Sequence, residues 1–377
     1  MTTICLSMIV KNEAKVIRRC LASVKPQITH WAIVDTGSTD DTVAIIREEL
    51  SGIPGELIER KWEDFATGRN QALDLARSTG ADYALFIDAD EQLIWPPALK
   101  MGPDMTHAVY GIMLRLNGSD LTWTRTVLTR LDLPWRWIGE IHEFLETPGV
   151  ELPAGSKALI TGAAFILSFC DGARNEGDRR KKFKSDEKIL RRMIKKDPAN
   201  ARNMYYLGQT LMGLHEWDRA EKAYEQRIEM SGWFEEVYTS MMQMAIIRAL
   251  RGDHWHDISR AYQRAYEFRP QRAEALMELS ILHRDHGEHA LSEMYARAAL
   301  RIHRPHDVLL VNEEIYRWRA ADELAGALAR LGRKEEAQEI IKRIIELPHL
   351  PDGERERAKD NLALLDEPPE GSSQAAA

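Results

Sequence analysis

The chain changes its periodicity once, near residue 175, and this change limits the folds that it can adopt. Before this point, short apolar runs of strand character alternate with helical patterns, and after it helical periodicity dominates. Alternating strands and helices are typical of a largely parallel sheet with crossover helices. We therefore predict an α/β domain with a Rossmann-like, mostly parallel sheet over residues 1–174 and an all-α domain over residues 175–365.

The pattern of the first part predicts individual elements. Strands are expected where β-branched and aromatic residues form short runs between turn residues, and helices where apolar residues recur at helical spacing. The predicted helices span residues 14–24 and 68–78, and the predicted strands span residues 3–10, 30–35, 56–61, 83–88, 110–116, 122–128 and 159–169.

Small and large side chains recur in the second part in the arrangement of tetratricopeptide repeats. The repeats begin at Leu207, Met241, Leu279 and Leu324, which lie 34, 38 and 45 residues apart, so the array is irregular. Repeat surfaces often mediate association, and a homodimer is one assembly that the sequence allows. Residues 366–377 are predicted to form a disordered tail.

Composition excludes several classes of protein. The formal net charge of −8 argues against a general nucleic-acid binder. Three scattered cysteines, Cys5, Cys20 and Cys170, match no zinc or redox spacing and indicate free thiols in a reducing compartment. No segment approaches the roughly 18 apolar residues of a membrane span. We expect a cytoplasmic protein without a membrane span.

Two carboxylates, Asp88 and Asp90, follow an apolar run that begins at Tyr83. Ligands of open α/β sheets bind at the carboxyl ends of the strands, and paired carboxylates suit a hard divalent cation that also holds phosphate oxygens. The alternative is a solvated strand end followed by an acidic turn.

Three further predicted elements carry polar residues at the same edge. The first strand runs into Asn12 and Glu13, the second ends in Asp35 beside Gly37, and a helix opens with Arg69. Each of these has an alternative explanation as a capped turn. Their convergence at one edge of a sheet favours a nucleotide site.

Four segments resemble, in this order, family 2 glycosyltransferases of the GT-A fold: CLSMIVKNEAKVIRRCLASV, VDTGSTDDT, WEDFATGRNQAL and YALFIDADEQL. The resemblance continues through WRWIGEIHEFLE, YYLGQT, WFEEVY and RPQRAEAL, up to about residue 365. The chain is similar to a bacterial branch that joins a GT-A domain to a tetratricopeptide-like helical domain. A related branch modifies peptides, which makes a polypeptide acceptor conceivable.

The resemblance implies roles for residues around the nucleotide. Asp35 occupies the position of an aspartate that recognises the nucleobase, and the backbone near Val10 would line the same pocket. Glu13, next to Asn12, would contact the ribose or another part of the donor. Arg69 matches an arginine that contacts the nucleotide.

The resemblance also implies a metal site. Asp88 would bind the ribose or a metal-bound water, and Asp90 would ligate Mn²⁺ or Mg²⁺ bridging the diphosphate. Many relatives place a further histidine before the helical domain, whereas this chain has Asp171 in that region as a weak substitute.

The segment from Trp135 to Glu143 is the second site of interest. Transfer by single displacement needs a base that takes the acceptor proton, and Glu143, in an aromatic-rich segment, is the predicted base. His142 is the predicted metal or diphosphate contact. Alternatively, Glu140 and Glu143 are surface acids and His142 is a structural histidine. Arg125 and Arg130 precede this segment and either steady phosphates or are ordinary strand charges.

Residues 174–196 carry eleven Lys or Arg against four acids. Such a run is usually a solvated helix face. The alternative is that residues such as Arg179, Lys182 or Lys184 reach a bound diphosphate or an anionic acceptor.

We therefore predict a metal-dependent, inverting glycosyltransferase that uses a nucleoside-diphosphate sugar, with a UDP-sugar expected, and a protein, peptide or glycan acceptor. One alternative is an inactive scaffold that binds a partner protein through its helical repeats. Another, a sugar nucleotidyltransferase, would need a glycine-rich basic loop directly after the first strand, and the residues from Lys11 to Ala14 do not form one.

Overall fold

The computed structural model describes residues 2–96, 105–119, 121–348 and 350–366. These residues form two compact units, which we call the sheet unit and the helical unit. The sheet unit contains the chain up to Ala223 together with Val308–Leu310, and the helical unit contains Tyr224–Asp307 and the residues from Val311 onward. The sheet unit thus includes helices α4 (Arg179–Lys196) and α5 (Ala201–Gly213), although the sequence predicts the domain boundary at residue 174.

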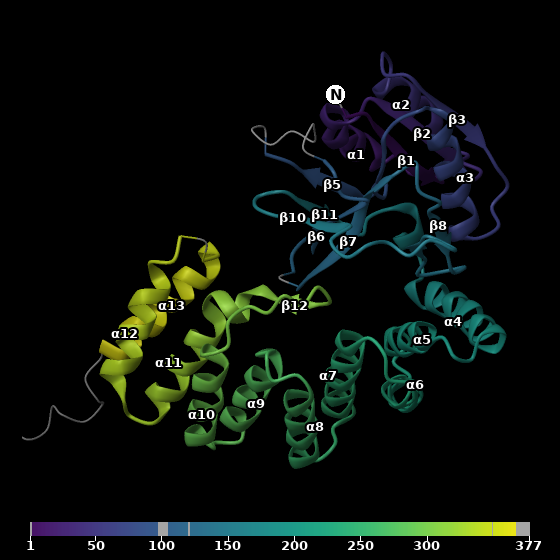
Figure 1. The fold of residues 1–377 in the computed structure, drawn as a ribbon. Helices are drawn as coiled ribbons and strands as arrows, with labels where there is room; N and C mark the ends of the chain where they lie inside the picture. The colour runs from purple at the N-terminus through teal and green to yellow at the C-terminus, as the bar shows by residue number, and fades with distance from the viewer. Residues whose placement is uncertain (1, 97–104, 120, 349, 367–377) are drawn as a thin grey trace, which may run out of the picture. The chain divides into compact units, whose positions relative to one another are not determined.

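The sheet unit is built on a mixed sheet with strand order β3-β2-β1-β4-β7-β6-β11-β5, and β10 also pairs with β6 (Figure 1). The strands β3, β2, β1 and β4 are parallel, whereas β7 is antiparallel to both of its neighbours β4 and β6. The strands are β1 (Ile4–Val10), β2 (His30–Asp35), β3 (Gly55–Glu59), β4 (Tyr83–Phe86), β5 (Glu91–Ile94), β6 (Val109–Leu116), β7 (Leu121–Arg130), β10 (Lys157–Ile160) and β11 (Phe165–Ser168). The predicted α/β class with parallel strands at its start is confirmed.

Helices cover both faces of this sheet. Strand β1 alternates its side chains: Leu6 packs in a core with residues of α1 (Ile17–Val24) and α2 (Thr42–Glu49), and Cys5 packs in a second core with residues of α3 (Phe65–Ser78). Because both faces are buried, β1 reads as a nearly continuous apolar run.

The strand register brings the predicted polar residues to one edge. Val10 lies opposite Asp35, and Ser7 lies opposite Phe86, two residues before Asp88. The carboxyl ends of β1, β2 and β4 therefore meet at the same edge of the sheet.

Several element boundaries differ from the sequence prediction. Helix α3 begins at Phe65 rather than Gly68, because Asp64 caps it by accepting the N–H of Thr67 at 2.7 Å. The strand predicted over residues 159–169 is two strands, β10 and β11, separated by a turn in which Gly162 has a φ of +92°. Sequence patterns missed β5 and the hairpin of β8 (Arg136–Ile138) and β9 (Phe144–Glu146), because strands of three or four residues are too short to show periodicity.

The helical unit confirms the expected all-α region. Most of its helices pack against the next one along the chain (Figure 1). Its elements are α7 (Phe234–Arg251), α8 (Trp255–Phe268), α9 (Glu274–Asp285), α10 (His289–Leu300), the short strand β12 (Val311–Asn312), a π-helical turn (Ile315–Arg319), α11 (Ala320–Arg330), α12 (Lys334–Ile345) and α13 (Asp352–Asp366), and α6 (Trp217–Glu229) crosses from the sheet unit. Residue 366 ends α13, and the rest of the predicted tail, residues 367–377, lies outside the described residues.

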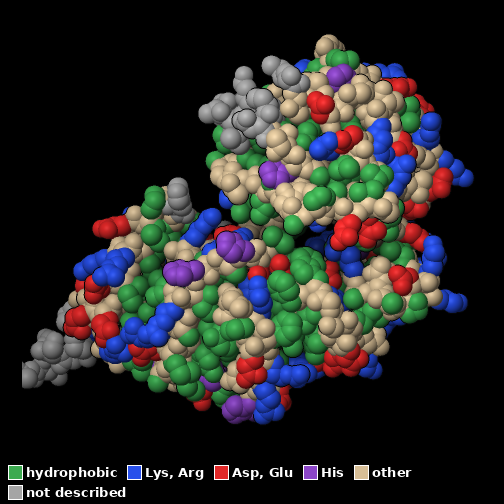
Figure 2. Space-filling view, in the orientation of Figure 1, with side chains coloured by type: hydrophobic (Ala, Val, Ile, Leu, Met, Phe, Trp, Pro, Cys, Tyr) green, Lys and Arg blue, Asp and Glu red, His purple; other side chains and the backbone are tan. Residues whose placement is uncertain are grey.

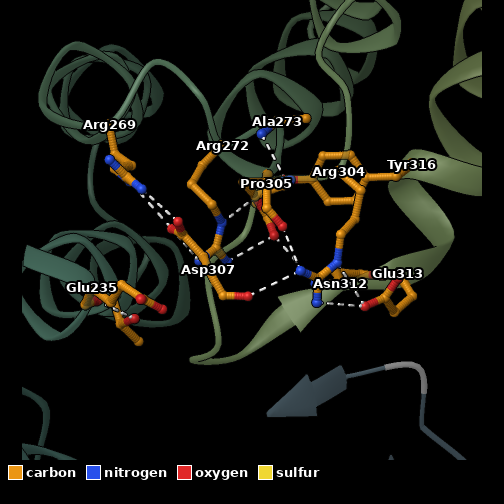
Figure 3. Close-up of polar contacts among 12 residues, drawn as sticks. Glu235, Arg269, Arg272, Ala273, Arg304, Pro305, Asp307, Asn312, Glu313 and Tyr316 are labelled. Carbon is orange, nitrogen blue, oxygen red and sulfur yellow. Dashed lines mark hydrogen bonds and ion pairs between the residues drawn. The ribbon is translucent and has the colours of Figure 1, made fainter. Parts of the chain in front are cut away.

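A buried charge network lies in the helical unit (Figure 3). Arg272, which is 1% exposed, forms a bidentate pair with Glu274 at 2.8 and 2.9 Å and approaches Asp307 at 3.4 Å. Arg269 pairs with both carboxylate oxygens of Asp307. These contacts connect the segment between α10 and α11 to the start of α9.

None of the helices in the described part of the chain combines the length and apolar composition needed to cross a lipid bilayer. On the face drawn in Figure 2, acidic and basic side chains are interspersed. That face therefore carries no broad basic stripe of the kind that nucleic-acid binders present.

Candidate functional site

Asp88, two residues after the end of β4, is held by two arginines. Its Oδ1 accepts a hydrogen bond from Nη2 of Arg69 at 2.7 Å, and its Oδ2 accepts one from Nη1 of Arg125 at 3.2 Å. Burial alone would raise the pKa of Asp88, but the two guanidinium groups outweigh it and hold the pKa well below its ordinary value. Asp88 is therefore ionised, and both of its oxygens already contact cations.

Glu91 completes this cluster, and sequence reasoning missed it. The side chain is buried, and its Oε1 accepts from Nη1 of Arg125 at 2.9 Å, while its Oε2 accepts from Nη2 of the same arginine and from the N–H of Asp88 at 2.9 Å. The only sequence signal was an acid three residues after Asp88, which a surface turn would also show.

Arg69 joins the strand end to the aromatic segment. Its Nε donates to Oε1 of Glu143 at 2.6 Å, and its guanidinium lies 5.1 Å from the ring centroid of Trp137. Asn70, the next residue of α3, exchanges two hydrogen bonds of 2.9 Å with the backbone of Trp137. Helix α3 thereby fixes the hairpin loop that carries Glu143 against the end of β4.

The carboxylates of Glu13 and Asp90 both contact the backbone of the segment that follows β11. Oε2 of Glu13 accepts the N–H of Ala173 at 3.1 Å, and Oδ2 of Asp90 accepts the N–H of Gly172 at 3.3 Å. A Cβ atom on Gly172 would meet Oε2 of Glu13 at 3.0 Å and Oδ2 of Asp90 at 3.1 Å. The absence of a side chain at residue 172 therefore leaves room for both carboxylates.

The environment of this pair favours its protonated or cation-bound form. Burial, opposed by the Ala173 hydrogen bond and reinforced by repulsion from Asp90, raises the pKa of Glu13 to about 7. Burial and then the charge of Asp88 also raise the pKa of Asp90. A divalent cation would remove the repulsion between the two groups.

The raised pKa of Glu13 predicts a pH dependence of stability in metal-free protein. Because the folded-state pKa of about 7 exceeds the ordinary value of 4.5, the stabilising contribution is complete below pH 4.5 and is lost as pH rises through 7. Allowing for partial solvent exposure, the loss should be roughly 1–2 kcal/mol. In urea unfolding with a chelator, Glu13→Gln should match wild type at pH 4 and exceed it at pH 8. A variant that follows the wild-type curve at both pH values would contradict this expectation.

The loops after β1 and β2 are tied to each other. Asp35 is 2% exposed and accepts the N–H groups of Gly37 and Ser38 at 3.0–3.2 Å, so its carboxylate organises its own turn. Oδ1 of Asn12 accepts the N–H of Thr39 at 2.7 Å, and the carbonyl oxygen of Val10 accepts the N–H of the residue after Asp35 at 2.9 Å. The structure thus gives Asp35, Asn12 and Val10 clear structural partners at the edge where a nucleotide was predicted.

His142 lies in the same hairpin loop as Glu143 but among cations. Its ring stacks on Tyr206 with centroids 3.8 Å apart and an interplanar angle of 1°. Burial, followed by repulsion from Arg174, Arg202 and Lys182, lowers its pKa to about 3. The imidazole is therefore neutral, and its cationic surroundings oppose a divalent cation there.

The basic residues between Arg174 and Lys184 differ in whether they lie near His142 or in solvent. Arg174, whose guanidinium lies over Phe65, pairs with Asp186, and Lys182 donates to Asn175 at 2.6 Å. Both neighbour His142, whereas Arg179 and Lys184 are exposed.

Asp171 and Arg130 are each paired elsewhere. Asp171 forms a bidentate pair with Arg19 at 2.7 and 3.0 Å, which weakens its case as a substitute ligand. Arg130 lies opposite Tyr83, at the start of β4, and pairs with Asp132. It is therefore at the other end of β4 from Asp88, unlike Arg125.

The donor set partly fits a divalent metal. The carboxylates of Asp90 and Glu13 are hard oxygen ligands of the kind that Mg²⁺ and Mn²⁺ bind. Among the described residues, no three or more His, Cys, Asp or Glu side chains are already arranged to hold an ion. An ion held by two carboxylates would complete its coordination with water and substrate phosphates, as Mg²⁺ commonly does.

Comparisons with known proteins find similarity in the part of the chain that forms this edge. The family model described as Glycosyl transferase family 2 matches residues 5–97, which include the ends of β1, β2 and β4 and the start of α3. A TPR repeat-containing protein of Synechococcus elongatus is 45% identical over 95 residues, or 25% of this chain and 22% of the relative. The SPbeta prophage-derived glycosyltransferase SunS of Bacillus subtilis is 40% identical over 89 residues, or 23% of this chain and 20% of the relative.

The matched segment thus spans about a fifth of each of these relatives. A crystal structure of MamA aligns with 50% of this chain and 97% of its own, with a TM-score of 0.35 and 18% identity. The family assignment rests on the N-terminal match, which coincides with the polar edge of the sheet. At residues 5–97 the chain therefore carries a segment that matches glycosyl transferase family 2.

Proposed function

We propose that this protein is a glycosyltransferase that moves a sugar from a nucleoside-diphosphate sugar to a protein, peptide or glycan acceptor. The observation that carries this proposal is the bridge of Arg69 between Asp88 and Glu143, which brings a carboxylate to the nucleotide edge of a family 2 domain. The expected donor is a UDP-sugar and the expected outcome is inversion at the anomeric carbon, both from the resemblance in sequence.

Glu143 is the proposed general base. Its side chain is 11% exposed, and Arg69 occupies only Oε1. Oε2 has no hydrogen-bond partner among the residues that the structure describes, so it is available to take the proton of the acceptor hydroxyl or amide as that group attacks. Trp137 is buried and packs against Arg69 and Phe86, so it supports the arginine that holds Glu143.

Asp90 and Glu13 are the proposed holders of Mn²⁺ or Mg²⁺. A bound divalent cation would neutralise charge on the diphosphate leaving group. We assign this role to Asp90 and Glu13 rather than to Asp88 or His142, because two arginines contact Asp88 and His142 is surrounded by positive charge. Asp35, Asn12 and Val10 remain the proposed lining of the nucleoside site.

A thermal-shift screen of the full chain against nucleoside-diphosphate sugars, with and without Mn²⁺, tests this proposal. A donor present at 100 times its Kd should stabilise the protein by about 2.7 kcal/mol. Asp90→Asn should lose the Mn²⁺-dependent part of the shift, because one of two carboxylates is removed, whereas the exposed Asp132→Asn should keep it. If no nucleotide sugar raises the melting temperature, the enzyme proposal fails, and the result supports the alternative of an inactive scaffold.

A further inference from the structure

We propose that Glu91 and Arg125 are positioning residues, which fix Asp88 and, through it, the Arg69–Glu143 pair. This inference rests on the proposed function, because it concerns the geometry of the proposed base. It also assigns Asp88 a role in holding Arg69 beside Glu143.

The contacts form one continuous series across four parts of the sheet unit. Arg125, from β7, holds Glu91, at the start of β5, with both terminal nitrogens, and one of these nitrogens also contacts Asp88. Asp88 holds Arg69, from α3, at 2.7 Å. Arg69 in turn holds Glu143, from the loop before β9, at 2.6 Å.

A lysine could not make the same contacts as Arg125. The planar guanidinium of Arg125 reaches two carboxylates at once, whereas a lysine ammonium presents a single charged atom. The N–H of Asp88 donates to Glu91 at 2.9 Å, so the same pair also sets the backbone of the turn that presents Asp88. Glu91 is 3% exposed, and among the described residues Arg125 is the cation that it contacts.

The balance of charge explains why this series affects Glu143. Three carboxylates, Asp88, Glu91 and Glu143, share two guanidinium groups, so each arginine is held between competing acids. When Arg125 no longer reaches Asp88, Asp88 is left with Arg69 alone and should draw it closer. Arg69 would then shift relative to Glu143, and the free Oε2 would lose its alignment with the acceptor. Displacements of about 1 Å at a reacting group can cost about 100-fold in rate.

Arg125→Lys and Asp88→Asn test the inference, with Arg130→Lys as the matched control on the same strand. Both test variants should lower kcat at least about ten-fold, while the donor KM and the melting temperature stay near wild type. Because both act on the same series of contacts, the double variant should lose no more than the worse single variant. Arg130→Lys should keep wild-type kcat, since Arg130 pairs with Asp132 at the other end of β4.

The outcomes separate the two proposals. A wild type that transfers no sugar from any donor overturns the proposed function and this inference with it. An active wild type matched by Arg125→Lys overturns the positioning role alone, as do losses that multiply in the double variant. A loss confined to donor KM also overturns it, because that result would place Asp88 in direct contact with the donor.

Discussion

Replacing Glu143 by glutamine should lower the rate of sugar transfer by about 10²–10⁴-fold. Glutamine keeps the shape of the side chain and an oxygen that can accept from Nε of Arg69, so the hairpin loop should stay in place. It cannot take a proton, and the acceptor must then attack without a base. Single-turnover transfer should show the full loss, while the thermal shift produced by the donor is retained.

Glu140→Gln is the matched control for this prediction. Glu140 lies three residues earlier in the same segment and pairs with Arg192 at the surface. Transfer by Glu140→Gln should therefore stay within about two-fold of wild type, since exposed pairs contribute little. Undiminished turnover in Glu143→Gln would remove Glu143 from the mechanism, and equal losses in both variants would indicate disruption of the loop.

The start of the fold could be predicted because its signal is local and repeated. Each early strand is an apolar run that ends in polar residues, and the rule for parallel sheets places these ends together. The register of Val10 opposite Asp35 shows that this rule holds here. Helix α3 was predicted three residues short because its start depends on the Asp64 cap.

The partners of the site residues could not be predicted in the same way. Asp88 and Asp90 are two residues apart, yet one contacts two arginines and the other lies beside Glu13 and the segment after β11. Those neighbours come from positions up to 82 residues away in the chain. Sequence pattern identifies which residues carry charge, but only the folded arrangement determines which charges face each other. For the same reason Glu91 was missed, and the cations that surround His142 could not be foreseen.

The largest effect on stability is expected at Arg272, because this arginine is buried among carboxylates in the helical unit. Arg272→Met should lower the free energy of unfolding of this unit by about 3–5 kcal/mol, because it leaves buried carboxylates with too few cations. Glu274 would keep the hydroxyl of Tyr316 at 2.8 Å, and Asp307 would keep Arg269, but the 1% exposed guanidinium between them would be gone (Figure 3). Urea unfolding followed by far-UV circular dichroism should show the helical transition at a lower urea concentration.

Two further variants separate the charge from the packing. Arg260→Met removes an arginine of α8 that is 72% exposed and lies 3.7 Å from Asp257, and it should cost less than about 1 kcal/mol. Arg272→Met combined with Glu274→Leu should recover part of the loss, because a buried charge without its partner costs more than a buried apolar pair. If the double variant is as unstable as Arg272→Met alone, the packing of Arg272 against Tyr238, rather than its charge, stabilises this unit.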